Sequence, residues 1–355
     1  MSEKTDLRSL LPEELPLLLK ENGIEAYRAE QIISWLEKGA GSFEEMTNLS
    51  KLHREKLSQI FTISNMKEAD RLVSKLDGTR KYLFTLPDGE YVESVLLSYK
   101  HGYSVCLSTQ VGCKMGCRFC ASTKAGFARN LSAGEILLQM VEITRDMRRE
   151  DKDFRIGHVV LMGIGEPLDN YDNVLRFLKL CNHPKLFGIG YRNISLSTCG
   201  ITPQIRRLMK EEIPLTLSIS LHASNSELRS ELMPVNRTYP MEELIRVCKE
   251  YTAHTGRRIS FEYAVIAGVN DTPERAKELI GLLGKWMNHL NLIPVNPTKE
   301  TNFRPADRKS MEAFVKALEK GGLSVTVRRT LGTDIEAACG QLRREKQIHA
   351  KEKTE

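Results

Sequence analysis

The stretch CKMGCRFC, residues 113–120, places three cysteine thiols within eight positions of the chain. A structural zinc site takes four ligands, and an ordinary iron–sulfur cluster takes four cysteines. Cys113, Cys117 and Cys120 alone therefore leave one position on a bound metal open, and an open position is where a cofactor or substrate binds. The pattern predicts a metal centre that takes part in chemistry.

The other cysteines do not complete a zinc ribbon. Cys181, Cys199, Cys248 and Cys339 stand singly, so the sequence has no second Cys-x-x-Cys pair. Cys106 lies seven positions before Cys113, outside the run. An iron–sulfur cluster with an open iron is the favoured occupant, and zinc is the alternative.

Composition indicates a globular chain of 355 residues, with 41% hydrophobic and 28% charged residues. This length suits one large domain, or one large and one small. We expect a cytoplasmic protein without a membrane segment, because the sequence has no apolar run of eighteen residues and no signal-peptide h-region. Eight cysteines then suit a reducing compartment. A net charge of +6 permits a polyanionic partner without requiring one.

Residues 1–62 are expected to form a helical accessory domain. Residues 28–37 form an amphipathic segment, and a further helix is expected at about 50–60. Glu45 follows Ser42 at the capping-box position, which predicts a helix start there. The domain is either helix-hairpin-helix-like or a simple solvated cap.

Residues 63–100 are expected to form a β-hairpin extension that links this domain to the body. Two Asp-Gly dipeptides, at 77–78 and 88–89, separate strand-like segments and are strong hairpin signals. Glu93 interrupts an apolar strand pattern. Taken alone, it is best interpreted as a carboxylate that faces outward.

Residues 101–342 alternate between strand and helix patterns, and 343–355 form a charged tail. The expected strands cover 105–108, 158–162, 193–197, 215–221, 259–265 and 290–294, and the expected helices cover 132–148, 170–182, 201–211, 240–254, 272–286 and 307–320. Such alternation predicts parallel βαβ units and an α/β fold. Six units favour a partial (β/α)6 barrel, with a doubly wound open sheet as the alternative.

Polar residues follow several of these strands at the carboxyl end, where a barrel gathers its active site. The segment MGIGEP, residues 162–167, combines two glycines that admit close approach to the backbone with a carboxylate that can accept from an ammonium group. The other residues at strand ends are Ser197, Ser220, Leu221, His222 and Asn296. Each alone is also a common turn or cap residue.

The Cys-x3-Cys-x2-Cys spacing resembles that of radical S-adenosylmethionine (radical SAM) enzymes. In that superfamily three cysteines hold a [4Fe–4S] cluster whose fourth iron binds SAM, and reduction of the cluster then releases a 5′-deoxyadenosyl radical. The resemblance implies that Cys113, Cys117 and Cys120 hold the cluster. It also implies SAM contacts from Gly165, Glu166, Ser197, Ser220, Leu221, His222 and Asn296.

Five segments together resemble the bacterial dual-specificity RNA methyltransferases of the RlmN type, over nearly the whole chain: CLSTQVGCKMGCRFC, MGIGEPL, SLH, PVN and DIEAACGQL. Members methylate carbon 2 of one adenosine in 23S ribosomal RNA and of the adenosine next to the anticodon in transfer RNA. The resemblance implies that Cys339 carries the methyl group as S-methylcysteine, that Cys106 forms a transient disulfide with it, and that Glu93 accepts a proton. It also implies an electron donor such as flavodoxin or ferredoxin.

Alternatives remain at this stage. A related antibiotic-resistance methyltransferase acts on carbon 8 of the same ribosomal adenosine, and an iron–sulfur RNA-binding or redox-sensing protein needs no Cys339. Cys106 and Cys339 can also be buried structural thiols. Candidates for RNA phosphate contacts are Lys124, Arg129, Arg328, Arg329, Arg343 and Arg344.

Overall fold

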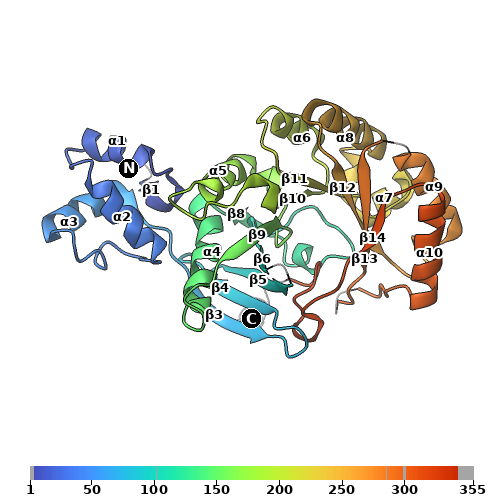
Figure 1. Cartoon of the computed structure of the whole chain (residues 1–355), viewed down its shortest axis with the longest axis horizontal. Coiled ribbons are helices and arrows are strands. Elements are labelled where there is room, and N and C mark those ends of the chain that lie inside the picture. Colours follow the sequence, from blue (N-terminus) through green and yellow to red (C-terminus); the bar gives the residue numbers. More distant parts are fainter. Residues whose placement is uncertain (1–3, 101, 285, 299–300, 343–355) are drawn as a thin grey trace, which may run out of the picture.

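The computed structural model describes residues 4–100, 102–284, 286–298 and 301–342. Within these residues, ten strands form one sheet in the order β14-β13-β12-β11-β10-β9-β6-β5-β4-β3 (Figure 1). The parallel half consists of β6 (Gly102–Cys106), β9 (Ile156–Leu161), β10 (Ile194–Thr198), β11 (Thr216–Ser220), β12 (Ile259–Val265), β13 (Asn288–Pro294) and β14 (Val325–Val327). The antiparallel half consists of β3 (Lys67–Val73), β4 (Arg80–Thr85) and β5 (Tyr91–Tyr99), and β5 pairs with β6.

Helices connect the parallel strands and lie along the outside of the sheet (Figure 1). They are α4 (Ala133–Met147), α5 (Tyr171–Asn182), α6 (Thr202–Met209), α7 (Ser226–Leu232), α8 (Met241–Thr255), α9 (Pro273–Leu283) and α10 (Arg308–Lys320). The parallel strands follow one another in chain order across the sheet, without the reversal that defines a doubly wound fold. The sequence prediction of a partial (β/α) barrel is therefore confirmed.

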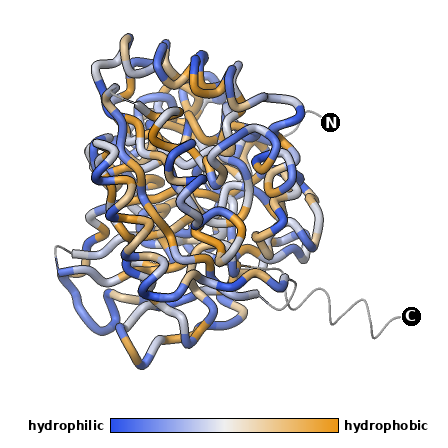
Figure 2. The backbone as a smooth tube through the Cα atoms, turned by 90° about the vertical axis from the view of Figure 1, so that its right-hand side faces the viewer, coloured by the Kyte–Doolittle hydropathy of each residue, from blue (hydrophilic) through white to orange (hydrophobic). Residues whose placement is uncertain are grey.

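Short 3-10 helices occur along the chain as well. They are η1 (Leu7–Ser9), η2 (Ala121–Thr123), η3 (Pro167–Asn170), η4 (Tyr191–Asn193), η5 (Pro234–Arg237) and η6 (Thr333–Ile335). Among the described residues, no helix has both the length and the apolar character that a membrane span requires. The hydropathy colouring of Figure 2 shows apolar segments gathered inside the molecule and polar segments around its edge.

The N-terminal region folds around its own apolar core, which includes Leu19, Ile32 and Leu57. Its elements are β1 (Thr5–Asp6), α1 (Glu14–Glu21), α2 (Arg28–Glu37), α3 (Lys51–Ile60) and β2 (Phe61–Thr62). The helix start expected at Ser42 was wrong. Residues 41–49 form turns and bends, and the carboxylate of Glu45 accepts a hydrogen bond from the Gly41 N–H at 2.9 Å.

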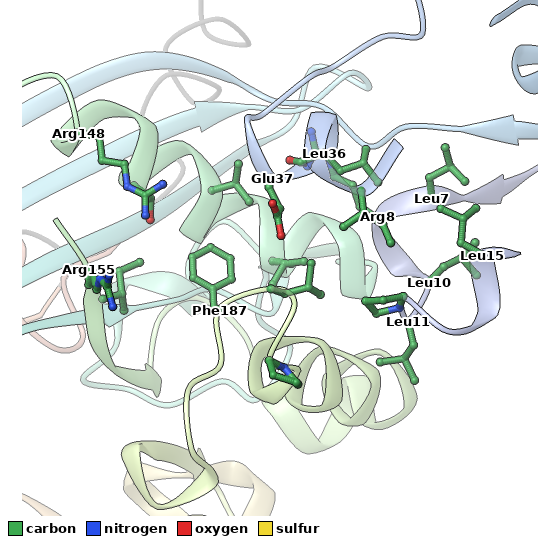
Figure 3. A pocket seen from close by; sticks show the side chains of 18 of the residues that line it. Leu7, Arg8, Leu10, Leu11, Leu15, Leu36, Glu37, Arg148, Arg155 and Phe187 are labelled. Atoms are coloured by element: carbon green, nitrogen blue, oxygen red, sulfur yellow. The ribbon is translucent and has the colours of Figure 1, made fainter. Parts of the chain in front are cut away.

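This region joins the barrel at the start of α4. The Gly134 N–H donates to Ser9 Oγ at 2.9 Å, and a Cβ at Gly134 would clash with the Asp6 carboxylate, so glycine permits the close approach. A cavity of about 440 Å³ opens beside this junction (Figure 3). It is lined mainly by apolar side chains, including Leu11 and Leu36 from the N-terminal region and Phe187 from the barrel, and it shares no described lining residue with the cavities below.

Candidate active site

The loop that carries Cys113, Cys117 and Cys120, here called the cysteine loop, leaves the sheet after β6. It is closed by the short antiparallel pair β7 (Gln110–Gly112) and β8 (Phe127–Asn130). Gly112 has φ +76°, and a Cβ there would clash with the Gly126 carbonyl, so only glycine fits where the loop crosses itself. The Cys113 N–H donates to the Gly126 carbonyl at 3.1 Å. This closure fixes the first cysteine at the rim of the barrel.

Cys113, Cys117 and Cys120 line one cavity together. Burial raises the pKa of the Cys113 thiol to about 12, and it raises the pKa values of the other two thiols as well. Among the described residues, no three His, Cys, Asp or Glu side chains converge closely enough to hold one metal ion. Cluster thiols bind separate irons, so they need not converge on one point. A bound cluster would take the thiols as thiolates and supply the positive charge that buried thiolates require.

The glycines of the MGIGEP segment have a packing role that the sequence analysis did not give them. A Cβ at Gly163 would lie 2.6 Å from the Leu107 carbonyl oxygen, and one at Gly165, with φ +109°, 2.6 Å from Gln110 Cβ. The segment therefore packs directly on the chain that leads into the cysteine loop. Both glycines also line the cavity.

Glu166 is only 3% exposed and lines the same cavity. Its carboxylate accepts from the Leu168 N–H at 3.0 Å through Oε1 and from the Cys199 N–H at 2.7 Å through Oε2. Burial raises its pKa, and these hydrogen bonds oppose that shift. The side chains of Thr198 and Cys199 also lower the pKa of this carboxyl through hydrogen bonds, so it is held as an acceptor at the wall of the cavity.

The next two strand ends bring their polar residues side by side. Ser197 Oγ and Ser220 Oγ lie 3.4 Å apart across β10 and β11, and both residues line the cavity. His222, with φ +56°, accepts a hydrogen bond from the Ala264 N–H at Nδ1 (2.8 Å), which leaves the proton on Nε2. Burial lowers its pKa to about 3, with the Arg229 charge as a further cause. His222 is a neutral donor toward the cavity.

Leu221, between Ser220 and His222, does not face the cavity as they do. Its side chain is fully buried in the barrel core, and it is not among the described residues that line either cavity. Its backbone N–H donates to the Glu262 carbonyl at 3.0 Å. Leu221 therefore fixes the turn that presents Ser220 and His222.

Asn296, after β13, reaches the C-terminal loop, which we define as residues 331–342. Its Nδ2 donates to the Cys339 carbonyl at 3.0 Å. The loop also rests on the cysteine loop, since the Ala121 N–H donates to the Gly340 carbonyl at 2.8 Å and Ser122 Oγ to the Leu342 carbonyl at 2.8 Å. Cys339 is thereby held in the wall of the cavity that Cys113, Cys117 and Cys120 also line.

Cys106 and Cys339, far apart in sequence, line a second, adjoining cavity together. Both are free thiols. Burial raises the pKa of Cys106 to about 12, Cys339 raises it further, and the Arg328 guanidinium opposes the shift. Cys339, Asn296 and Arg328 belong to the walls of both cavities, so the cavity shared by the two thiols adjoins the one lined by Cys113, Cys117 and Cys120.

Glu93 does not face outward. It is 5% exposed on β5 and lies next to the buried Lys81, with Glu93 Oε1 3.5 Å from Lys81 Nζ. Its carbonyl accepts from Ser108 Oγ at 2.6 Å. Glu93 is not among the described residues that line either cavity, but it lies two positions before Val95, which pairs with Cys106 on β6.

Two buried charged residues were missed from the sequence. Arg229 on α7 is 0% exposed and donates to the carbonyls of Cys199 (2.6 Å) and Ser220 (3.1 Å), so it ties two strand ends together. Glu262 on β12 lines the first cavity and accepts from Asn291 Nδ2 at 2.7 Å. A carboxylate within a buried strand was a readable signal for Glu262, whereas the polar segment around Arg229 gave none.

The candidate RNA contacts have different surroundings. Lys124 and Arg329 are exposed, whereas Arg129 is engaged by Asp88 at 2.5 Å and by Glu135 at 2.8 Å. Arg328 lies in the walls of both cavities instead of on the outer surface. Arg343 and Arg344 lie outside the described residues. Contact of any of them with RNA remains a prediction.

Three thiols at the rim of a partial barrel, with a carboxylate and hydroxyls on the neighbouring strand ends, define the radical SAM class of enzymes. Residues 107–280 match the model of the radical SAM superfamily, and residues 5–63 match that of the ribosomal RNA large subunit methyltransferase N-terminal domain. A solved radical SAM methyltransferase from Sphaerobacter thermophilus is 40% identical, with a TM-score of 0.89 over 95% of this chain and 98% of that one.

Two relatives show to which family of radical SAM enzymes the chain belongs. Both are described as probable dual-specificity RNA methyltransferases RlmN. The protein of Alkaliphilus metalliredigens is 47% identical and matches over 99% of both chains. That of Pelotomaculum thermopropionicum is 51% identical over 97% of this chain and 93% of its own. The chain belongs to the dual-specificity RNA methyltransferase RlmN family.

Proposed function

We propose that this radical SAM RNA methyltransferase methylates carbon 2 of one adenosine in 23S ribosomal RNA and of the adenosine next to the anticodon in transfer RNA. Cys339 carries the methyl group, Cys106 releases the product and Glu93 accepts the proton. The observation that carries this proposal is the meeting of Cys106 and Cys339 in one cavity that adjoins the cluster cysteines. Family membership favours these roles over those of two structural thiols.

The cofactors are a [4Fe–4S] cluster and SAM, which together supply a 5′-deoxyadenosyl radical. Cys113, Cys117 and Cys120 would hold the cluster, and we assign SAM binding to the backbone of Gly165 and to side chains of the strand ends. The side chains in this set are those of Glu166, Ser197, Ser220, His222 and Asn296. Leu221 would contribute through its backbone alone, because its side chain is buried in the core.

Carbon 2 of adenine is electron-poor, so it does not attack a methyl cation equivalent directly. A thiol that first accepts the methyl group removes that difficulty, because transfer of a hydrogen atom from the S-methyl group to the 5′-deoxyadenosyl radical leaves a carbon radical that adds to an electron-poor ring carbon. After transfer, attack of the Cys106 sulfur on the Cys339 sulfur forms a disulfide and breaks the bond between Cys339 and the transferred carbon. The electron pair of that bond goes to the carbon, which takes up a proton and becomes the methyl group of the product. An external reductant then restores both thiols. The neighbouring Arg328 guanidinium lowers the pKa of Cys106 against the larger effect of burial, which raises it.

The remaining parts of the proposal concern partners. The target adenine must leave its stack to reach buried thiols, so we expect base extrusion. The helical region of residues 1–62 and the β extension of 63–100 are the proposed RNA contacts. The electron donor is of the flavodoxin or ferredoxin class, and an enzyme with these RNA substrates works in the cytoplasm.

Mass spectrometry of RNA tests the function. Ribosomal and transfer RNA are treated with anaerobically reconstituted protein, reductant and SAM, beside the Cys339→Ala variant. Methyl on carbon 2 that is absent with the variant supports the proposal. Methyl on carbon 8 would assign the protein to the resistance methyltransferases, and no methyl from protein with an intact cluster would refute the substrate assignment.

A further inference from the structure

Two opposite charges lie buried together on the antiparallel half of the sheet. Lys81 on β4 and Glu93 on β5 have side chains that are 8% and 6% exposed, and Lys81 Nζ lies 3.5 Å from Glu93 Oε1. A carboxylate removed from water keeps its charge only beside a cation or several hydrogen-bond donors. Removing both charges of an ion pair from water also has a substantial desolvation cost. A buried pair of this kind therefore calls for a reason other than stability.

Strand alternation explains where this pair points. On β4, Tyr82 and Phe84 pack in the main core with α4, so Lys81 faces the opposite side of the sheet. Lys81 pairs with Val95 on β5, and Val95 pairs with Cys106 on β6. Lys81, Glu93 and Cys106 consequently share one face, because directly opposed residues of paired strands point to the same side.

The C-terminal loop covers this face. Lys81 Nζ also donates to the Glu336 carbonyl at 3.2 Å, three residues before Cys339. The turn before β4 contributes two more contacts, from the Lys75 N–H to Asp334 Oδ2 (3.0 Å) and from the Gly332 N–H to Asp77 Oδ2 (2.9 Å). In Figure 1 the red C-terminal segment lies beside the strands of this half. Lys81 thus touches both the carboxylate and the loop that carries Cys339.

We propose that Lys81 is the positioning residue of Glu93: it keeps this carboxylate ionised and links it to the C-terminal loop, so that the base and the Cys339 carrier are assembled together. This inference rests on the proposed function, in which Glu93 accepts the proton. Lys81 acts through Glu93 and the loop.

The step served by this arrangement is a single proton transfer. The bond between carbon 2 of the adenine and its hydrogen breaks, the electron pair stays on the ring, and the proton passes to a carboxylate oxygen of Glu93. A buried carboxyl without Lys81 would hold its own proton and could not accept another. Neutralising Lys81 should therefore stall the reaction after the base has become attached to Cys339 and before release.

The test compares Lys81→Met with Lys81→Arg and with Arg80→Met. Methionine keeps the bulk of the lysine side chain and removes the charge, whereas arginine restores the charge. Arg80 is the adjacent cation on the opposite face, where it pairs with Glu150 at 2.6 Å, so its variant controls for loss of a cation from β4. For each full-length reconstituted protein we would measure S-methylation of Cys339, 5′-deoxyadenosine, methylated RNA and covalent protein–RNA adduct.

For Lys81→Met we expect normal Cys339 methylation and 5′-deoxyadenosine formation, at least tenfold less methylated RNA, and accumulation of adduct. Lys81→Arg should recover much of the product, and Arg80→Met should behave like the wild type. Parallel loss of Cys339 methylation and RNA methylation would show that Lys81 only holds the loop, and unchanged product would also overturn the inference. The proposed function fails separately, if the wild type makes no carbon-2 product or if Glu93→Gln stays fully active.

Discussion

The parallel and antiparallel halves of the sheet hold their reactive side chains in different ways. In the parallel half, Glu166, Ser220 and His222 follow the carboxyl ends of strands and line a cavity at the barrel rim. In the antiparallel half, Lys81 and Glu93 lie within strands, on a face that the C-terminal loop covers. The carboxyl ends of parallel strands all lie at the same end of the sheet, so residues that follow them come together. Neighbouring antiparallel strands have their carboxyl ends at opposite ends of the sheet, so residues of the antiparallel half come together on one face instead.

The β extension is more than a link between domains. It continues the catalytic sheet through the β5–β6 pairing, and its turn at 74–79 holds the C-terminal loop. The N-terminal helical region, by contrast, packs around a separate core and touches the barrel at the start of α4. We therefore expect the parallel half to generate the radical and the antiparallel half to complete the methyl transfer.

The largest effect should come from the parallel half. Cys117→Ala removes one of the three proposed cluster ligands, so we expect loss of bound iron and loss of both SAM cleavage and RNA methylation to background. Iron analysis, the visible absorbance of the cluster and 5′-deoxyadenosine formation measure these outcomes. Retention of SAM cleavage would contradict the division between the halves.

Glu93→Gln, in the antiparallel half, should be more selective. The amide keeps the size of the side chain but cannot accept the proton, so RNA methylation should fall by roughly 100- to 10,000-fold. Iron content and 5′-deoxyadenosine formation should remain near the wild-type values. Loss of the cluster in this variant would show that the functions of the two halves of the sheet are not separate.

His222, in the parallel half, should make the folding stability depend on pH. Because the pKa of His222 falls from 6.5 to about 3 on folding, the unfolded state binds the extra proton between these values. This contribution to stability is complete above pH 6.5 and is lost as the pH falls toward 3. Between pH 6.5 and 5 the loss should be about 2 kcal/mol. Urea unfolding of the wild type and of His222→Gln at pH 5 and pH 7.5 measures it, and an equal pH dependence in both proteins would refute it.

The smallest effect concerns the other face of the antiparallel half. Tyr82 donates to Asp146 Oδ2 at 2.8 Å, away from Lys81, and Asp146 also pairs with Arg71 and Arg80. Tyr82→Phe should therefore lower the free energy of unfolding by about 1–2 kcal/mol, because Asp146 keeps its cations. RNA methylation should be unchanged. Impaired methylation in this variant would show that the two faces are coupled.

The sequence by itself determined the catalytic body. Hydrophobic periodicity located the main strands and helices of the barrel within a few residues, as for Ile259–Val265. The helix expected at 132–148 begins with a capping box of Ser132 and Glu135. These features succeed because they depend on local backbone preferences and on neighbours three or four positions away. The cysteine spacing is likewise local, so it identified the class of metal centre before any fold was known.

Only the tertiary structure decided how distant residues meet. It buried Glu93 beside Lys81, brought Arg229 to the carbonyls of two strand ends and placed Arg328 in the walls of both cavities. It also made Gly163 and Gly165 packing residues, because the chain that leads into the cysteine loop lies against them. Burial and ion pairing depend on sheet order and on the path of the C-terminal loop, and these follow from the packing of the whole chain.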